Sequence, residues 1–126
     1  MFFSRSVRDT HVSFSSAESE LRGFALATFE VLWARDFLSE LGFAQTAATP
    51  IYEDNEAVVT LMTTLSSPSG RTKHVNKLRR TVQQYCDKGE TRCVKTPGET
   101  NIADLFTKNL AADRFKMLSD LACGRA

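Results

Sequence analysis

Three carboxylates in this chain stand at positions where a folded protein can use them for chemistry. Glu20 lies near the start of a long stretch that lacks helix breakers, and Asp54 follows the short run Ile51–Glu53. Asp104 comes shortly after the turn dipeptide Pro97-Gly98. A carboxylate that turns inward needs a partner, a proton or a metal ion, because burying an unpaired charge is costly. The elements around these residues must therefore explain where each side chain points.

Glu20 belongs to a predicted helix that runs from Ala17 to about Gly42, interrupted only by Gly23, which costs roughly 1 kcal/mol against alanine. A step of 100° per residue places Glu20 in one row with the apolar positions Phe24, Ala27, Val31, Ala34 and Leu38. We therefore expect Glu20 to face inward at the mouth of the core. Glu18, which has capping-box spacing from Ser15, is expected to form a solvated ion pair with Arg22 four residues later.

Asp54 lies where a predicted strand runs directly into an amphipathic helix with apolar positions at Val58, Leu61, Met62 and Leu65. The carboxyl ends of strands are where α/β folds place their sites. Alternatively, Asp54 or Asn55 is simply the N-cap of this helix. Asp104 lies in the first turn of a short predicted helix, where the helix dipole favours an anion. Its alternative role is an ion pair with Lys108, four residues later.

A basic segment begins the third predicted helix and contains Arg71, Lys73, His74, Lys77, Arg79 and Arg80. Such a cluster can hold a nucleic-acid backbone without reading its sequence. It can equally be a solvated helix face. No aromatic residue interleaves with these side chains, so base stacking on a single strand is not indicated. The residues alone leave both roles open.

The pattern along the chain predicts a mixed α/β domain in which helices outweigh strands. Strands are expected at residues 10–14, 51–53 and 91–96, and helices at 17–42, 55–65, 72–88, 100–108 and 112–121. Opposite the Glu20 row, the aromatic side chains of Phe29, Trp33 and Phe37 are expected to form a second packing face.

Composition excludes several classes of protein. The 126 residues suit one domain, and the net charge of +1 argues against binding nucleic acid by bulk charge alone. Three cysteines without metal-finger spacing favour reduced thiols in an intracellular setting. Two distant histidines give no support for a zinc site. There is no apolar run of transmembrane length, and the N-terminal Met-Phe-Phe-Ser-Arg becomes charged too soon for a signal peptide.

Four segments resemble, in order and interval, the ribonuclease H domain of copia-type LTR retrotransposon polyproteins. Ser-Ser-Ala-Glu-Ser-Glu at 15–20 resembles the S-S-x-E-A-E motif of that family, and Ile-Tyr-Glu-Asp-Asn at 51–55 resembles I-Y-x-D-N. Arg-Thr-Lys-His-Val at 71–75 resembles R-T-K-H-I, and the segment at 101–108 resembles N-x-A-D-x-F-T-K. The resemblance covers roughly residues 7 to 121.

The resemblance implies a ribonuclease H-like mixed sheet with flanking helices, lacking the first strands, in an endonuclease that cuts RNA in RNA–DNA hybrids. Carried over by motif, Glu20, Asp54 and Asp104 would be the catalytic carboxylates and would bind two Mg²⁺ ions, for which Mn²⁺ can substitute. Hard cations of this kind prefer oxygen ligands, and they activate the attacking water and steady the leaving oxygen.

The resemblance also implies partners. Asn55 would orient Asp54 and, with Arg71, Lys73 and His74, would lie at the substrate. The implied partners are an RNA–DNA hybrid and the reverse transcriptase of the same polyprotein, with no membrane. The implied location is the cytoplasm, a retroelement particle or the nucleus.

One motif of the family has no counterpart. Its first catalytic aspartate lies on a first strand well upstream of the S-S-x-E motif, whereas only 19 residues precede Glu20 here. A lost ligand weakens metal binding and geometry, and absent strands leave a sheet edge that can pair with another chain. We therefore expect an N-terminally truncated copy with impaired cleavage. The alternatives are a non-catalytic nucleic-acid-binding remnant and an interaction module.

Overall fold

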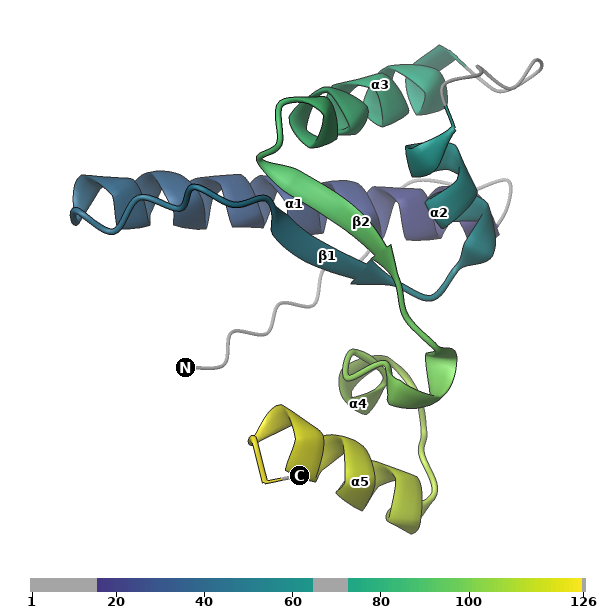
Figure 1. Ribbon diagram of the computed structural model, residues 1–126. Helices are drawn as coiled ribbons and strands as arrows, with labels where there is room; N and C mark the ends of the chain where they lie inside the picture. The colour runs from purple at the N-terminus through teal and green to yellow at the C-terminus, as the bar shows by residue number, and fades with distance from the viewer. Residues whose placement is uncertain (1–15, 65–72, 126) are drawn as a thin grey trace. The chain divides into compact units, whose positions relative to one another are not determined.

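A parallel pair of strands and three helices form the larger part of the computed structural model (Figure 1). The structure describes residues 16–64 and 73–125. Contacts divide these residues into a first unit, residues 16–64 and 73–95, and a second unit, residues 96–125. The expectation of a single domain for the whole chain stays a prediction.

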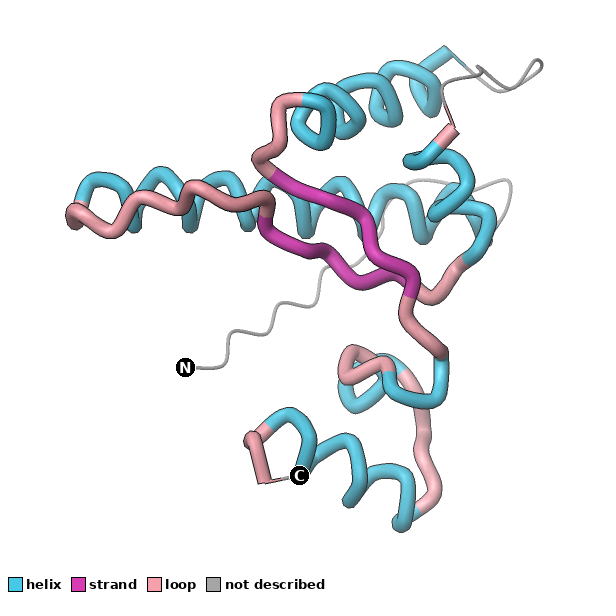
Figure 2. Tube along the Cα trace, in the orientation of Figure 1, coloured by secondary structure: helices cyan, strands magenta, loops and turns pink. Residues whose placement is uncertain are grey.

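The first unit consists of α1 (Ser16–Glu40), β1 (Thr49–Glu53), α2 (Glu56–Thr63), α3 (Lys73–Asp87) and β2 (Thr91–Lys95). The two strands run parallel and in register, with Ile51 beside Cys93 and Glu53 beside Lys95 (Figure 2). Along β1, Ile51 and Glu53 are buried while Tyr52 between them is exposed. One face of the strand therefore points into the unit, as the period of two requires.

The core of the first unit is apolar and is contributed by α1, β1, α2 and α3. Its buried members are Leu21, Phe24, Ala25, Ile51, Val58, Leu61, Met62, Val75 and Val82. Fully burying one such large side chain contributes about 1.5–3 kcal/mol. The predicted inward face of α2 is confirmed at Val58, Leu61 and Met62. On α3 the apolar spacing at Val75, Leu78, Val82 and then Tyr85 or Cys86 likewise predicts an inward face, of which Val75 and Val82 are buried and the others are half-buried.

The buried side of α1 differs from the prediction. Glu18 is buried at 8% exposure and accepts a hydrogen bond from Arg22 at 2.9 Å, whereas Glu20 is exposed. The predicted ion pair is therefore confirmed, but the predicted orientations of the two glutamates are wrong. The reason is that Leu21, Ala25 and Thr28 are buried together with Phe24, which turns the buried arc of α1 toward Glu18 and leaves Glu20 at its edge.

The opposite side of α1 carries the aromatic residues. The ring of Phe29 meets Tyr85 of α3 edge to face, with centroids 6.4 Å apart. Trp33 and Phe37 stack on each other at 5.6 Å and remain 65% and 48% exposed. Phe29 is itself 41% exposed, so the predicted second packing face is confirmed only as the contact of Phe29 with Tyr85. It is wrong for Trp33 and Phe37, which pack on each other and stay exposed.

Glycines end the two longest helices, as predicted. Gly42 and Gly89 have φ angles of 86° and 74°, which only glycine adopts without strain. After each glycine the next amide bonds back into the helix, from Phe43 to the Leu38 carbonyl at 2.8 Å and from Glu90 to that of Tyr85 at 3.0 Å. This is the Schellman arrangement, which satisfies carbonyls that the helix end leaves open.

The second unit contains the 3₁₀ turn η1 (Gly98–Thr100) and the helices α4 (Asp104–Thr107) and α5 (Ala112–Ala122). The single helix predicted at residues 100–108 is wrong, because η1 and α4 are separate. The cause is local: the side chain of Asn101 accepts a hydrogen bond from the Ala103 amide at 3.1 Å, which replaces a helical bond with a turn.

The structure confirms a mixed α/β class, mostly helical, with a two-stranded parallel sheet. The strand predicted at residues 10–14 and the capping residue Ser15 lie outside the described residues. No helix in the described part of the chain is long and apolar enough to cross a membrane.

Candidate functional site

Asp54 lies directly after β1, and Asn55 separates it from α2. The Asn55 side chain accepts hydrogen bonds from the amides of Ala57 at 3.0 Å and Val58 at 3.4 Å, so Asn55 is the N-cap. The alternative in which Asp54 itself caps the helix is therefore wrong. Within the described part of the chain, the half-buried Asp54 carboxylate makes no hydrogen bond or ion pair, while the Asp54 carbonyl accepts one from Lys95 at 2.6 Å. Its carboxylate is left available for a ligand.

Glu53 is a buried carboxylate that the sequence analysis did not consider. It is 7% exposed and accepts a hydrogen bond from the Asn55 amide at 2.9 Å. Burial raises the pKa of Glu53, and the carboxylates of Glu20 and Asp54 raise it further, against the amides of Asn55 and Asp54, which lower it. Glu20 and Asp54 are thus each close enough to Glu53 to act on its charge. Strand alternation could have identified Glu53, because it shares the inward face with Ile51.

The raised pKa of Glu53 makes a prediction about stability. Because the pKa of Glu53 is raised above its ordinary value of 4.5, the folded protein binds the Glu53 proton more tightly than the unfolded chain does. The stability of the folded protein therefore falls as the pH rises from 4.5 to the folded pKa. Glu53→Gln stays neutral and keeps an oxygen for the Asn55 amide. We expect the melting temperature of the variant, relative to that of the unmodified protein, to increase as the pH rises from 4.5. Melting curves recorded by circular dichroism across this range test it, and parallel pH profiles would contradict it.

Asp104 lies in the second unit and is 2% exposed. Its two carboxylate oxygens pair with Lys108 at 2.8 Å and with Arg114 at 2.9 Å. Arg114 also donates to the Gly98 carbonyl at 2.7 Å, which ties α5 to η1. The predicted ion pair with Lys108 is confirmed, and the pair with Arg114 adds a contact that no local spacing indicates. A metal ion at Asp104 would compete with both cations.

The basic segment is divided by the structure. Arg71 lies outside the described residues, as do the side chains of Lys73 and His74, whose backbone forms the first turn of α3. Arg79 is 4% exposed and donates to the carbonyls of Leu61 at 2.9 Å and Thr64 at 2.6 Å. Lys77 and Arg80 are exposed. Arg79 therefore binds carbonyls at the end of α2, while Lys77 and Arg80 remain on the surface.

The side chains at the end of β1 have the donor chemistry that Mg²⁺ prefers, since all are carboxylates or amides with oxygen donors. In the described ranges no three His, Cys, Asp or Glu side chains are already arranged to hold a metal ion. Glu20 and Asp54 each act on the charge of Glu53, and Asp104 belongs to the other unit. The metal-binding and substrate roles of all seven nominated residues stay predictions.

Cys93 lies beside this carboxylate group on β2. Burial, together with the nearby Glu53 carboxylate and the Cys86 thiol, raises the pKa of Cys93 to about 11. The thiolate is the reactive form of cysteine. The Cys93 thiol therefore stays protonated at neutral pH and is a poor nucleophile.

Comparison with known proteins identifies a distant relative. The chain is similar to the Retrovirus-related Pol polyprotein from transposon TNT 1-94 of Nicotiana tabacum, with 26% identity over 110 residues. The match covers 87% of this chain and 8% of that polyprotein. No protein-family model matches the chain, and no solved structure is significantly similar to it. The chain is thus distantly related to a retrotransposon Pol polyprotein, as its motifs predicted.

Proposed function

We propose that this chain corresponds to the ribonuclease H part of a retrotransposon Pol polyprotein, with a ribonuclease H-like fold and an ancestral activity on RNA–DNA hybrids. The observation that carries the proposal is the end of β1. There the Asp54 carboxylate is left without a structural partner among the described residues, because Asn55 caps α2. Glu20 of α1 acts on the charge of Glu53, the residue next to Asp54.

Each residue has a proposed role. Glu20, Asp54 and Asp104 bind the metal ions, and Asn55 fixes the backbone that carries Asp54. Mg²⁺, when bound, lowers the pKa of the attacking water and stabilises the leaving oxygen. Because Lys108 and Arg114 pair with both Asp104 oxygens, a metal ion at Asp104 would have to share the carboxylate with them or displace them. Arg71, Lys73 and His74 position the hybrid through its phosphates. The reverse transcriptase of the same polyprotein is the proposed protein partner.

Cleavage of an end-labelled RNA–DNA hybrid in Mg²⁺ and then Mn²⁺ tests this function. We expect the RNA strand alone to be cut, and EDTA to stop the reaction. Matched RNA and DNA duplexes serve as substrate controls, because an endonuclease specific for hybrids leaves both intact. Folded protein that cuts nothing in either metal ion would contradict the proposed activity.

A non-catalytic nucleic-acid-binding remnant is the second candidate. It is favoured by the two ion pairs that occupy both oxygens of Asp104, together with the exposed cations Lys77 and Arg80. Salt-dependent hybrid binding that survives Asp54→Asn, without cleavage, supports this candidate. A dimer without hybrid affinity would instead favour an interaction module, for which the stacked rings of Trp33 and Phe37 offer an exposed surface.

A further inference from the structure

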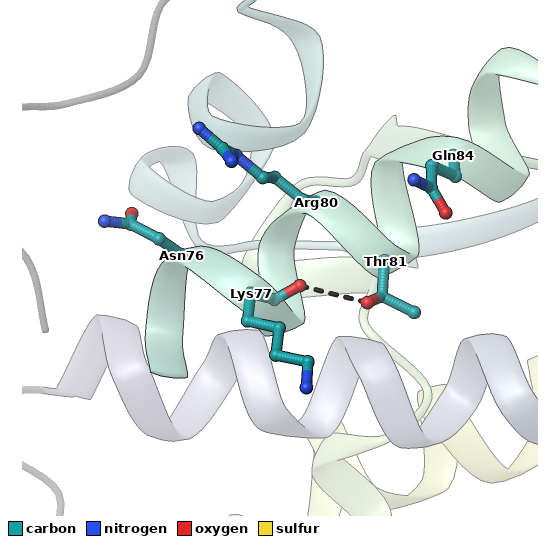
Figure 3. Close-up of a pocket in the computed structure, with 5 residues that line it drawn as sticks. All are labelled: Asn76, Lys77, Arg80, Thr81 and Gln84. Atoms are coloured by element: carbon teal, nitrogen blue, oxygen red, sulfur yellow. Dashed lines mark hydrogen bonds between the residues drawn. The ribbon is translucent and has the colours of Figure 1, made fainter. Parts of the chain in front are cut away.

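A hollow of about 480 Å³ lies on the surface of α3. The described residues that line it all come from this helix: Asn76, Lys77, Arg80, Thr81 and Gln84 (Figure 3). Every one of these side chains is polar, and none is acidic. A surface depression of this composition suits a negatively charged, hydrogen-bonding ligand rather than an apolar one.

The two cations of the hollow are not used elsewhere in the described structure. Lys77 and Arg80 are exposed, and neither side chain makes a hydrogen bond or ion pair with a described residue. Arg79, which lies between them in sequence, instead turns inward to the carbonyls of Leu61 and Thr64. Arg79 therefore has a structural role, whereas Lys77 and Arg80 lie on the surface and can bind a ligand.

The arrangement suits an extended polyanion better than a single anion. In Figure 3 Asn76 and Arg80 extend to one side of α3, whereas Lys77 extends to the other. Lys77 and Arg80 lie three residues apart, which is about 4.5 Å along the helix axis at 1.5 Å per residue. A nucleic-acid strand carries one phosphate per roughly 3.4 Å of helix axis. A strand that passes over α3 can therefore meet both cations with different phosphates, which a single small anion cannot do.

We propose that this hollow binds the sugar–phosphate backbone of a nucleic acid. Arg80 donates through its planar fork to one phosphate and Lys77 donates to another, while the amide of Gln84 offers a further donor. These contacts position the nucleic acid without reading its sequence. The identity of the ligand as an RNA–DNA hybrid rests on the proposed function, but the recognition chemistry depends only on the phosphates.

Fluorescence anisotropy of a labelled RNA–DNA hybrid tests the proposal. Titrations are made with the full chain in EDTA, where metal-dependent cleavage does not occur, at salt concentrations from about 50 to 200 mM. We expect the double variant Lys77→Gln/Arg80→Gln to bind more weakly than the unmodified protein. The plot of log K against log salt should also become less steep by about 2, since each lost phosphate contact reduces the magnitude of this slope by roughly 1. Circular dichroism verifies that the variant is folded.

Arg92→Gln/Lys116→Gln is the matched control, because it removes two cations from exposed positions outside the hollow. We expect its salt slope to stay near that of the unmodified protein. Equal slopes for both double variants would overturn the proposal, and so would failure of the unmodified protein to bind hybrid, DNA duplex or RNA duplex. Binding that depends on Lys77 and Arg80 without any cleavage contradicts only the proposed enzyme activity. Cleavage with unchanged binding by the Lys77/Arg80 variant contradicts only this site.

Discussion

Asp54→Asn is expected to slow hybrid cleavage in Mg²⁺ by on the order of 100-fold or more. Replacing a group that merely orients a metal ligand already costs about 10–100-fold in affinity or activity, and losing the ligand itself costs more. The substitution keeps the shape of the side chain and removes its charge. The N-cap hydrogen bonds belong to Asn55 and are unaffected. Initial rates on an end-labelled hybrid measure the effect.

Glu56→Gln is the matched control for this prediction. Glu56 is an exposed carboxylate in the first turn of α2, two positions after Asp54, so its replacement removes the same charge from the same helix end. We expect the control to retain most of the rate. An Asp54→Asn variant that cleaves as fast as the unmodified protein would remove Asp54 from the site. Mn²⁺ binding followed by water proton relaxation gives a second readout that is independent of turnover.

Local rules predicted the parts of the fold that depend on a few neighbouring residues. The apolar spacing of Val58, Leu61 and Met62 predicted the buried face of α2, and Asn55 was one of two residues expected to cap it. The glycines at 42 and 89 predicted the ends of α1 and α3. In each case the interaction that decides the structure lies within about one helical turn, so the sequence pattern contains it.

Features set by contacts between distant elements could not be predicted in the same way. Periodicity places Glu18 and Glu20 on different sides of α1, but which side is buried depends on α2 and α3, and Leu21 and Ala25 decide it. The pair between Asp104 and Arg114 joins residues ten positions apart. For the site, motif resemblance nominated Asp54 and Glu20, while the contribution of Glu53 became evident only from its burial at the end of β1.

Replacing Arg79 is expected to reduce stability strongly, because this side chain donates hydrogen bonds to carbonyls at the end of α2. The last carbonyls of α2 have no partner within the helix, and Arg79 donates to two of them, at Leu61 and Thr64. Arg79→Met preserves much of the side-chain volume but leaves both oxygens without these donors. The Leu61 carbonyl is a buried acceptor, and leaving one unsatisfied costs about 1–3 kcal/mol, whereas Thr64 is exposed and water can reach its carbonyl. We therefore expect the free energy of unfolding to fall by about 1–3 kcal/mol.

Urea denaturation followed by circular dichroism measures this loss, and two further variants assign its cause. Arg80→Met removes the neighbouring, exposed arginine and should change stability by no more than about 0.5 kcal/mol. Arg79→Lys retains the positive charge but lacks the planar fork that reaches two carbonyls, so it should recover only part of the loss. Full recovery by lysine would mean that charge near the end of α2 is what matters. Equal losses for Arg79→Met and Arg80→Met would contradict a specific role for Arg79, and the division of the basic segment into one structural arginine and two surface cations would fail with it.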